Sequence, residues 1–408
     1  AAFFRVAIRQ QTRKFIDENG REPNEKEASE IKEYSLSTVR GTVQADQLKE
    51  AMGQNTLVFN LDTALRMMGD VAEFYVDNEV RNHYFVSISG YHIDEAGANP
   101  ITQAALTLSN GLTYVELFKA RGLDPDKFLR NFSWFFSNGM DPEYAVIGRV
   151  SRRIWAIAMR DLYGVGERGQ KLKYHIQSSG RSLHSQEFTW NDYRTTLQAL
   201  YALADNANSL HTNSRDEAFG TPTEDTVRDA VAIQLILAKE YGWLRNENPL
   251  QGSFVADYLT DEVEEKVLRI FEEMHSRGGV LGALEVNYQR NRIQDEGMLY
   301  EHRKHTGETP IVGVNTFTDE DSATPSADDF DLDVTRSDEK EKLKVIKRNA
   351  EFREAHSKEA AEGLSKLKNT AREGGNLFEV MMEIVEHCSV GQVTQALFES
   401  GGKFRRNM

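Results

Sequence analysis

The chain contains FSWFFSNG at residues 132–139 and KLKYHIQSSG at residues 171–180, and these two stretches decide its fold. Each is a short run of β-type residues that ends in small or polar residues, and a helical pattern at 142–163 lies between them. FVSISG at 85–90 and SLHT at 209–212 repeat the arrangement on either side. Short strands that alternate with amphipathic helices are typical of a parallel sheet with helical crossovers.

The spacing of the strand ends indicates which parallel fold this is. With Gly90, Ser137, Gln177 and His211 taken as strand ends, the intervals are 47, 40 and 34 residues, which is the length of one strand–helix unit with its loops. Repeated units of that length favour an α/β fold of the (β/α)8 TIM barrel type over a doubly wound sheet. A barrel needs about eight such units. Only about six are recognisable, so we expect the missing N-terminal strands upstream of Ala1.

The remaining elements extend this pattern in both directions. Further β-type runs are TVRGTVQ at 38–44 and QGSFV at 251–255, and further helical patterns lie at 100–121, 191–206, 224–241 and 259–277. Residues 319–333 contain seven acidic residues and no basic residue, a composition that cannot bury a core. We expect a helix end and a charged surface loop at 1–36, the barrel at 37–317, an acidic linker at 318–340, and a C-terminal helical region at 341–408, with helices at 338–372 and 376–398.

The composition argues against several classes of protein. The 408 residues include 49 Lys+Arg and 64 Asp+Glu, a formal charge of 49 − 64 = −15, which disfavours binding to a nucleic-acid backbone. No run approaches the roughly 18 apolar residues of a membrane span. Cys388 is the one cysteine, so no internal disulfide can form, which fits a reducing cytosol. The first residues show no targeting pattern. We expect a soluble, cytoplasmic protein that binds neither nucleic acid nor membranes.

Motifs of the common hydrolases and phosphate-loop enzymes are absent. The sequence has no G-x-S-x-G, no H-E-x-x-H and no G-x-x-x-x-G-K-[ST] motif. Cys388 lies far from the polar strand ends, which disfavours a Cys–His nucleophile. His302 and His305 are spaced for one helix face, but no third ligand is placed, and Arg303 and Lys304 would repel a cation. We therefore predict no metal site within this chain.

Polar residues gather at the ends of the predicted strands. The clusters are Tyr91–His92, Asn138–Gly139, Gln177–Gly180 and His211–Asn213. In a (β/α)8 barrel these ends converge on one face, so they predict a pocket rich in amides, hydroxyls and imidazoles and poor in paired carboxylates. For each residue alone, the alternative role is to cap the next helix or to bond buried backbone.

His92 is the residue that this pattern favours most as a functional group. It can donate a hydrogen bond to a substrate carbonyl inside a closed barrel, where a fixed donor is worth more than in water. The alternative is a core histidine bonded to neighbouring backbone. Arg130, Arg152 and Arg153 flank the helix that begins near Pro142, and they either meet phosphate groups or are plain surface charges.

The strings SISGYHIDEAGANP, GTVQADQLKE, YHIQSSGRSLHSQE, NSLHTNSRDEA and TPTEDTVR resemble one enzyme family, the adenosylcobalamin-dependent acyl-CoA mutases. The resemblance covers residues 37–317 and, more loosely, 376–408. It implies a (β/α)8 barrel with a coenzyme A thioester along its axis and a radical rearrangement of the carbon skeleton. A cofactor that supplies the reactivity accounts for the scarcity of acids, bases and nucleophiles. The family's D-x-H-x-x-G cobalt-ligand motif is absent, so a cobalamin-binding domain outside this segment is expected to supply that ligand.

The resemblance also implies roles for individual residues. His92 matches the histidine that hydrogen-bonds the thioester carbonyl, and Tyr91 and Gln177 complete the expected catalytic set. The other matches are Thr42 and Gln44 for the substrate, Ser133 and Ser209 for coenzyme A, Glu95 and Glu217 for the ribose hydroxyls of the adenosyl group, and His175, Gly180 and Ala218 for the cofactor. Arg130 is added to the substrate-binding set as a phosphate contact, and Asn131 stands where methylmalonyl-CoA mutases have an arginine.

One departure from the family pattern bears on the substrate. Methylmalonyl-CoA mutases have, shortly after LKE, an arginine that pairs with the free carboxylate of the acyl group, and this chain has Gln54 there. A neutral amide cannot neutralise a buried carboxylate, whose desolvation costs on the order of several kcal/mol. The expected substrate therefore lacks that carboxylate, as isobutyryl-CoA does, and the expected product is n-butyryl-CoA.

Several alternatives stay open at this point. A branched homologue, pivalyl-CoA, is a possible second substrate, and 2-hydroxyisobutyryl-CoA mutases also have an amide at position 54. Methylmalonyl-CoA mutase activity and a non-catalytic, mutase-like scaffold are further alternatives. GRSLH and NENPLQGSF resemble members in which a cobalamin-binding domain and a GTPase chaperone domain precede the mutase domain. These domains, in the same polypeptide, and a second copy in a homodimer are the expected partners.

Overall fold

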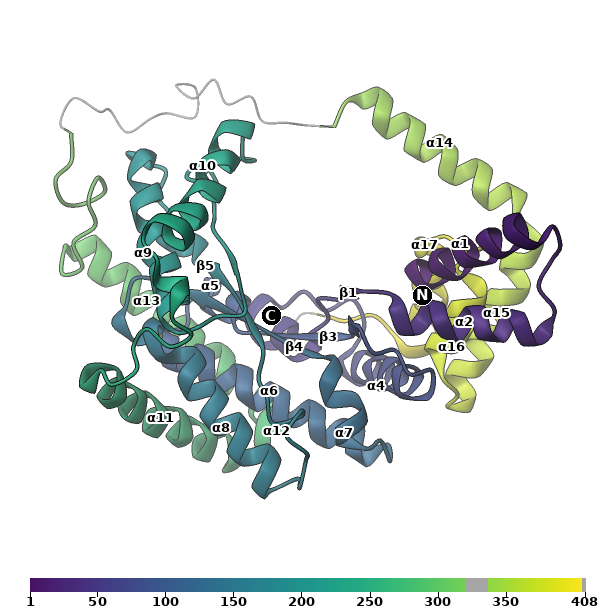
Figure 1. Ribbon diagram of the computed structural model, residues 1–408, viewed down its shortest axis with the longest axis horizontal. Coiled ribbons are helices and arrows are strands. Elements are labelled where there is room, and N and C mark those ends of the chain that lie inside the picture. Colours follow the sequence, from purple (N-terminus) through teal and green to yellow (C-terminus); the bar gives the residue numbers. More distant parts are fainter. Residues whose placement is uncertain (320–336, 406–408) are drawn as a thin grey trace.

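The computed structural model describes residues 1–319 and 337–405. Its central sheet has four parallel strands in the order β3 (Val86–Ser89), β4 (Phe132–Asn138), β5 (Tyr174–Ser178) and β6 (Ser209–His211) (Figure 1). A second parallel pair joins β1 (Gly41–Thr42) to β2 (His83–Tyr84). Only Phe85 separates β2 from β3, so β1 lies beside the same extended segment that continues into the central sheet.

Helices connect the successive parallel strands. They are α4 (Leu61–Asp77) between β1 and β2, α6 (Pro100–Ala120) between β3 and β4, α8 (Ile147–Asp161) between β4 and β5, and α9 (Asn191–Ala204) between β5 and β6. This alternation confirms the predicted α/β fold class. The described residues supply six strands, of which β1 and β6 each have one neighbour, so closure into an eight-stranded barrel is not observed within them.

Local sequence signals fix where these helices begin. The Asn60 side chain accepts a hydrogen bond from the backbone of Thr63 at the start of α4. Asn99 caps α6 in the same way through Thr102, and Pro100 occupies the first turn, where its missing N–H costs no helical bond. The Asn99 cap lies within one residue of the start that the sequence predicts for the helix at 100–121, whereas α4 was not predicted.

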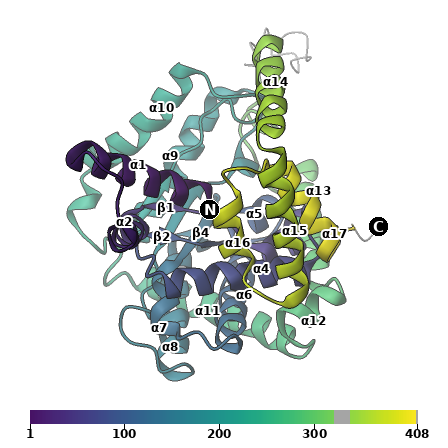
Figure 2. The same ribbon diagram turned by 90° about the vertical axis from the view of Figure 1, so that its right-hand side faces the viewer.

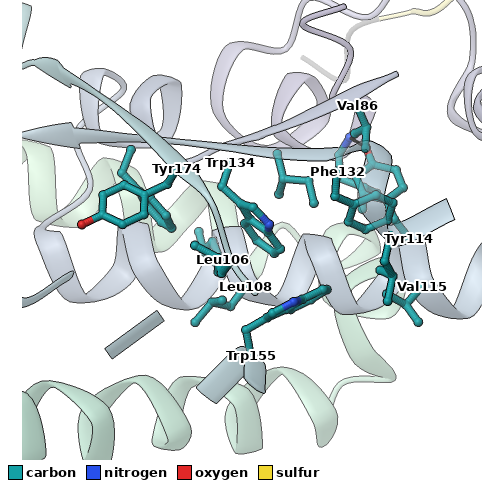
Figure 3. Close-up of a cluster of buried hydrophobic side chains, with 14 of the residues drawn as sticks. Val86, Leu106, Leu108, Tyr114, Val115, Phe132, Trp134, Trp155 and Tyr174 are labelled. Atoms are coloured by element: carbon teal, nitrogen blue, oxygen red, sulfur yellow. Dashed lines mark hydrogen bonds between the residues drawn. The ribbon is translucent and has the colours of Figure 1, made fainter. Parts of the chain in front are cut away.

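Alternate residues of the strands point to opposite faces of the sheet. On one face Phe132, Trp134 and Phe136 of β4 pack against α6 and α8, and Trp134 meets Trp155 of α8 with ring centroids 4.7 Å apart (Figure 3). The next layer is α11 (Phe254–His275), which packs on both α6 and α8. The opposite face, which we call the lumen face, has Ser133, Phe135, His175 and Gln177. The strand period of two residues therefore separates the core from the polar groups.

The N-terminal helix lies beside the C-terminal helical region. α1 (Ala2–Asn19) packs against α16 (Leu377–Ile384), and Arg5 of α1 pairs with Glu386 at 2.7 Å (Figures 1 and 2). α15 (Ser357–Glu373), α16 and α17 (Val390–Gly401) form a separate small core around Leu367, Leu377 and Leu397. α16 also contacts α4, so this helical region is joined to the larger body.

Four expectations about secondary structure are wrong. Residues 25–36 of the expected charged loop lie in α2 (Glu25–Thr38), because Asn24 and Glu27 make a reciprocal capping box. QGSFV is not a strand, because Ser253 caps α11 and Phe254 begins that helix. The single helix expected at 338–372 is divided at His356 into α14 (Glu339–Ala355) and α15. The helix expected at 376–398 is likewise divided into α16 and α17.

The other helices complete the fold. They are α3 (Gln47–Lys49), the π-helical turn η1 (Glu50–Gln54), α5 (Tyr91–Glu95), α7 (Pro125–Phe128), α10 (Glu224–Leu235), α12 (Gly279–Glu285) and α13 (Tyr288–Thr306). Most of the expected acidic linker at 318–340 lies outside the described residues, and α14 begins at Glu339. Among the described helices, none combines the length and apolar character that crossing a bilayer requires.

Candidate active site

A cavity of about 530 Å³ opens on the lumen face of β4, β5 and β6. Six of the predicted site residues line it, namely Thr42, Gln44, Ser133, His175, Gln177 and Ser209. The strand register places Phe135 beside His175 and His175 beside Ser209. Residues far apart in the sequence therefore meet in one place, as the polar strand ends predicted. Within this row of side chains, Nδ1 of His175 and Oγ of Ser209 form a hydrogen bond of 2.8 Å.

Phe135 contacts both Tyr91 and His92, two of the predicted catalytic residues. Its ring stacks on Tyr91 with centroids 4.9 Å apart and an interplanar angle of 8°. His92 contacts the same ring edge-on at 5.8 Å, and His175 lies at 5.2 Å on β5. Sequence reasoning missed Phe135 because it reads as one more apolar residue of a buried strand. The alternation within FSWFFS, which places it on the same face as Ser133, is the signal that could have identified it.

His92 is held as a neutral imidazole. Burial, and then the positive charge of Lys49, lower the pKa of His92 to about 4, although Glu50 acts in the opposite direction. Its Nδ1 atom is buried and has no hydrogen-bond partner within the described residues. The alternative role, a core histidine bonded to backbone, is therefore not what the structure shows for this nitrogen. His92 does not itself line the cavity and adjoins it through the ring of Phe135. A neutral ring with an unused nitrogen retains a capacity for one further hydrogen bond.

Gln177 connects β5 to the Tyr91–His92 segment. Its Nε2 atom donates to the phenolic oxygen of Tyr91 at 3.0 Å and to Oδ1 of Asn213 at 3.0 Å. Asn213 is itself fixed, because its backbone N–H donates to Oγ of Ser178 and its side chain donates to the carbonyl of Ser178. This network joins three of the four polar clusters that the sequence places at successive strand ends.

Glu95 lies at the end of α5 and faces the turn after β5. One carboxylate oxygen, Oε1, accepts hydrogen bonds from Oγ of Ser179 at 2.9 Å and from the backbone N–H of Gly180 at 2.8 Å. A Cβ atom on Gly180 would lie 3.0 Å from Oε2 of Glu95, so glycine keeps that second oxygen uncovered. Burial, and then the neighbouring carboxylate of Asp94, raise the pKa of Glu95 to about 7.

Glu217 and Ala218 lie on the loop after β6 and are exposed. Burial of its carboxylate and the charge of Asp216 raise the pKa of Glu217. The charges of Glu95 and Glu217 both help to raise the pKa of Tyr91, after the larger effect of burial. Both carboxylates therefore act on the same phenol, and the structure places Glu217 near the other predicted residues, whereas no contact of Ala218 ties it to them.

Gln54 ends the turn η1, which packs against α5 beside His92. The Gln54 side chain is exposed, but its Oε1 atom accepts a hydrogen bond at 3.1 Å from Nζ of Lys49, a side chain that is only 4% exposed. Lys49 is also paired with Glu50 at 2.5 Å. Sequence reasoning missed this buried ammonium, although LKE contains it. The ammonium that donates to Gln54 is therefore already paired with the carboxylate of its own neighbour Glu50.

A second cavity, of about 790 Å³, adjoins the first at the amino ends of the strands. Thr42, Tyr84 and Lys173 line both cavities. The basic residues on its wall are Arg40, Arg81, Arg130, Arg168, Lys171 and Lys173, against the one acidic residue Glu167. Nε of Arg130 is buried without a partner among residues 1–319 and 337–405, and burial, Arg168 and Arg81 lower the pKa of Arg130. Sequence reasoning found Arg130 alone, because the other cations come singly from separate loops.

Other sequence candidates have structural roles or stand apart. Arg152 donates to backbone carbonyls around Leu172 and Asp205, and Arg153 pairs with acidic residues of α11. Asn131 donates to two backbone carbonyls, which closes the loop before β3 onto the start of β4. His302 and His305 are exposed on α13, and within the described part of the chain no group of three or more metal-ligating side chains is found.

Comparison with known proteins places these features in one family. The family model described as methylmalonyl-CoA mutase matches residues 26–403. A fused isobutyryl-CoA mutase of Geobacillus kaustophilus is 58% identical over the whole chain, and one of Nocardia farcinica is 57% identical over the whole chain. The chain spans 38% of the length of each of these two relatives.

A more distant relative has a different acyl substrate in its name. The large subunit of a 2-hydroxyisobutanoyl-CoA mutase of Aquincola tertiaricarbonis is 33% identical over 91% of the chain, which spans 66% of that subunit. The match of the family model over most of the chain agrees with the parallel α/β architecture and with the polar lumen face described above.

Proposed function

The chain belongs to the methylmalonyl-CoA mutase family, and on this premise we propose that it is the substrate-binding part of an isobutyryl-CoA mutase, which interconverts isobutyryl-CoA and n-butyryl-CoA with adenosylcobalamin. The observation that carries this proposal is the pairing of Lys49 with Glu50 beside a neutral Gln54. The identity of 57–58% to fused isobutyryl-CoA mutases supports the same substrate.

Coenzyme A would enter through the basic cavity. Its phosphate groups are polyanionic, and the six cations on that wall provide the charge-assisted donors that phosphates prefer. Thr42, Tyr84 and Lys173 lead from this cavity to the lumen, so the pantetheine arm would extend along the strands toward His92. Ser133 and Ser209 lie along that path and can bond its amide groups.

His92 would orient the thioester. A neutral imidazole presents one N–H donor without adding a full charge, so it can hold a carbonyl oxygen while leaving the acyl group uncharged. The stacking of Tyr91 on Phe135 fixes the backbone turn that carries His92. Gln177, on β5, holds the Tyr91 hydroxyl by a direct hydrogen bond.

The acyl group would be selected by charge. A methylmalonyl group carries a second carboxylate, whose burial without a cation costs on the order of several kcal/mol. Lys49 cannot serve as that cation, because Glu50 already pairs with it, and Gln54 offers only an amide. A branched hydrocarbon acyl group has no such requirement.

The environment of Glu95 fits the adenosyl group of the cofactor. Oε1 is occupied by Ser179 and Gly180, whereas Oε2 remains uncovered because residue 180 has no side chain. A carboxylate oxygen in that position can accept a ribose hydroxyl, and Glu217 supplies a second carboxylate nearby. When bound, adenosylcobalamin supplies the carbon radical that begins the rearrangement by homolysis of its cobalt–carbon bond. The role of the aromatic and amide groups of this chain is to exclude water and to hold the substrate.

The remaining parts of the enzyme would come from outside this segment. The relatives are named as fused proteins and are far longer than this chain, which supports a cobalamin-binding domain and a GTPase chaperone domain in the same polypeptide. A homodimer and a cytoplasmic location belong to the same proposal. The match of Ala218 to a cofactor contact is also part of it.

A product assay tests the proposal. The full-length protein is incubated with adenosylcobalamin and isobutyryl-CoA, and n-butyryl-CoA is measured by chromatography. We expect His92→Ala to lower kcat/KM by about 100-fold or more, because it removes a fixed donor from the cavity. His302→Ala, on the exposed face of α13, is the control and should keep full activity. Equal turnover by wild type and His92→Ala would support a scaffold instead, and equal rates with methylmalonyl-CoA would overturn the substrate assignment.

A further inference from the structure

A third cavity, of about 460 Å³, lies outside the lumen, between the loops that follow β4 and β5, α9 and the end of α13. None of the residues to which the sequence gives a catalytic, substrate or cofactor role lines it, although Gly139 and Ser179 belong to the polar clusters at the strand ends. Ser179 is the one wall residue that also bonds Glu95. The volume is in the range of sites that enclose small organic molecules.

The cavity walls are mainly apolar and aromatic. They include Met140, Trp190, Tyr193, Leu197 and Ile311. The segment 309–312 covers one side, where Nη2 of Arg194 donates to the carbonyl of Val312. An apolar body of a ligand could therefore be enclosed between α9 and this segment.

Two arginines on the wall form no short ion pair within the described residues, although the charge of Arg181 acts on the carboxylates of Asp94 and Asp141. Within residues 1–319 and 337–405, neither Arg181 nor Arg194 forms an ion pair. Arg181 donates one hydrogen bond, to the carbonyl of Asp94 at 2.9 Å, and Arg194 donates to Asn191 and Val312. A guanidinium has five N–H donors, so each arginine retains donors for a ligand.

Tyr300 connects these two charges. The guanidinium carbon of Arg181 lies 4.7 Å from the centre of the Tyr300 ring, and both Arg181 and Arg194 act electrostatically on its phenol. The one carboxylate on the wall is Asp141, and its pKa is raised by burial and by the acidic neighbours Glu143 and Asp94, although Arg181 acts in the opposite direction. The wall thus has two guanidinium groups against one carboxylate that burial disfavours as an anion.

His184 provides an independent indication of a ligand. The residue is only 8% exposed and lines the cavity, yet its ring forms no hydrogen bond within the described residues. Burial, Lys304 and Arg194 lower the pKa of His184 to about 4, so the ring is neutral. Neither ring nitrogen is fully buried, so both keep accessible surface and the ring can bond a ligand that enters the cavity.

We propose that this cavity is a binding site for a small organic carboxylate with an apolar or aromatic body. The carboxylate would be held by Arg181 and Arg194, as guanidinium groups hold carboxylates through paired N–H donors. The body would lie against Trp190 and Leu197, and His184 would bond a polar group of the ligand. This site is distinct from the coenzyme A path, because the two share no wall residue.

Tryptophan fluorescence provides the test in the full-length protein. The probe is 4-nitrobenzoate, which quenches a nearby indole, and its neutral twin 4-nitrobenzamide has almost the same shape. We expect saturable quenching by the carboxylate with a dissociation constant at least about tenfold lower than that of the amide. Trp190→Phe should abolish the quenching while calorimetry still detects binding, because phenylalanine preserves the apolar wall.

Two variants, each lacking one arginine, test whether the charge of Arg194 binds the carboxylate of the probe. Arg194→Gln should raise the dissociation constant of 4-nitrobenzoate by about tenfold and leave that of 4-nitrobenzamide unchanged. Arg160→Gln removes the same charge from an exposed site on α8 and should change neither constant. Equal affinity for the two probes, or equal loss in both variants, would overturn the proposal, as would the absence of binding by calorimetry. Circular dichroism confirms that each variant is folded, and Tyr300→Phe provides a second, milder probe of the same site if Arg194→Gln unfolds.

Discussion

The two faces of β4 differ in whether the side chains on them have partners within the protein. On the face toward α6 and α8, Phe132, Trp134 and Phe136 are buried among other apolar side chains. On the lumen face, Ser133 lines a cavity and Phe135 contacts two histidines, one of them with a buried nitrogen that has no partner. The first set is complete without a ligand, whereas the second is not. The difference indicates that one strand serves stability on one side and binding on the other.

The helix-facing side should give the largest effect on stability. Trp134→Ala would remove a side chain that is 1% exposed and packed on Trp155, and we expect the free energy of unfolding to fall by about 3–5 kcal/mol. Denaturant unfolding of the full-length protein followed by circular dichroism measures this change. Tyr193→Ala, an exposed aromatic residue on α9, is the control and should cost far less. Similar losses in the two variants would show that the Trp134 face is not the core of this unit.

Glu95 differs from Trp134 because burial of its ionised carboxylate destabilises the folded protein. Its pKa is raised to about 7 in the folded protein, so the folded state binds a proton more tightly than the unfolded state. Stability from this group is present below its ordinary pKa and is lost as the pH rises through 7. Glu95→Gln should therefore be more stable than wild type by up to about 3 kcal/mol at about pH 8, with little difference near pH 4.5.

Thermal unfolding across this pH range measures the effect. The control is Glu116→Gln, on the outer face of α6, where the carboxylate accepts one solvent-exposed hydrogen bond from the hydroxyl of Tyr163. Glu296→Gln is less suitable, because the Glu296 carboxylate bonds Thr102 in the first turn of α6. A stability difference between Glu95→Gln and wild type that does not change with pH would contradict the raised pKa.

His92 should show a smaller effect with the opposite dependence on pH. Its pKa is lowered to about 4 in the folded protein, so the unfolded state takes up the proton first as the pH falls. The stability that depends on the neutral ring is complete above about pH 6.5 and is lost toward pH 4. At about pH 5 the loss is about 2 kcal/mol, and His92→Gln should not show it. His302→Gln, on an exposed helix face, should follow the wild-type profile.

The sequence was most informative about the fold where packing decides the structure. The β-type runs that became β3 to β6 and the helices around them were predicted because their apolar residues follow the period of each element. QGSFV was misread because a β-type composition of five residues cannot be distinguished from a capped helix start. The charged stretch that became α2 was misread because polarity was weighed above the capping box at Asn24 and Glu27.

The site was predictable in part, and for a different reason. Residues such as Gln177 and His175 follow directly from strand ends that converge, so their meeting in one cavity was expected. Lys49 and the cations around Arg130 were not, because their grouping depends on how separate loops fold over the amino ends of the strands. The sequence around one charged loop residue does not indicate which residues will surround it in the folded protein. The apolar face of α10 shows the same limit, since Val227 and Val231 have the period of a buried face and are exposed in this chain.

The smallest expected effect lies on the lumen side of β4 itself. Ser133→Ala removes one hydroxyl from the cavity wall and leaves Phe132 and Trp134 in place, so we expect the free energy of unfolding to change by less than about 0.5 kcal/mol. The KM for isobutyryl-CoA should nevertheless rise by about fivefold, because a hydrogen bond to the bound coenzyme is lost, with kcat little changed. Steady-state kinetics and denaturant unfolding of the same preparation separate the two quantities. A loss of stability without a change in KM would place Ser133 with the core instead of the cavity and would remove the distinction between the two faces.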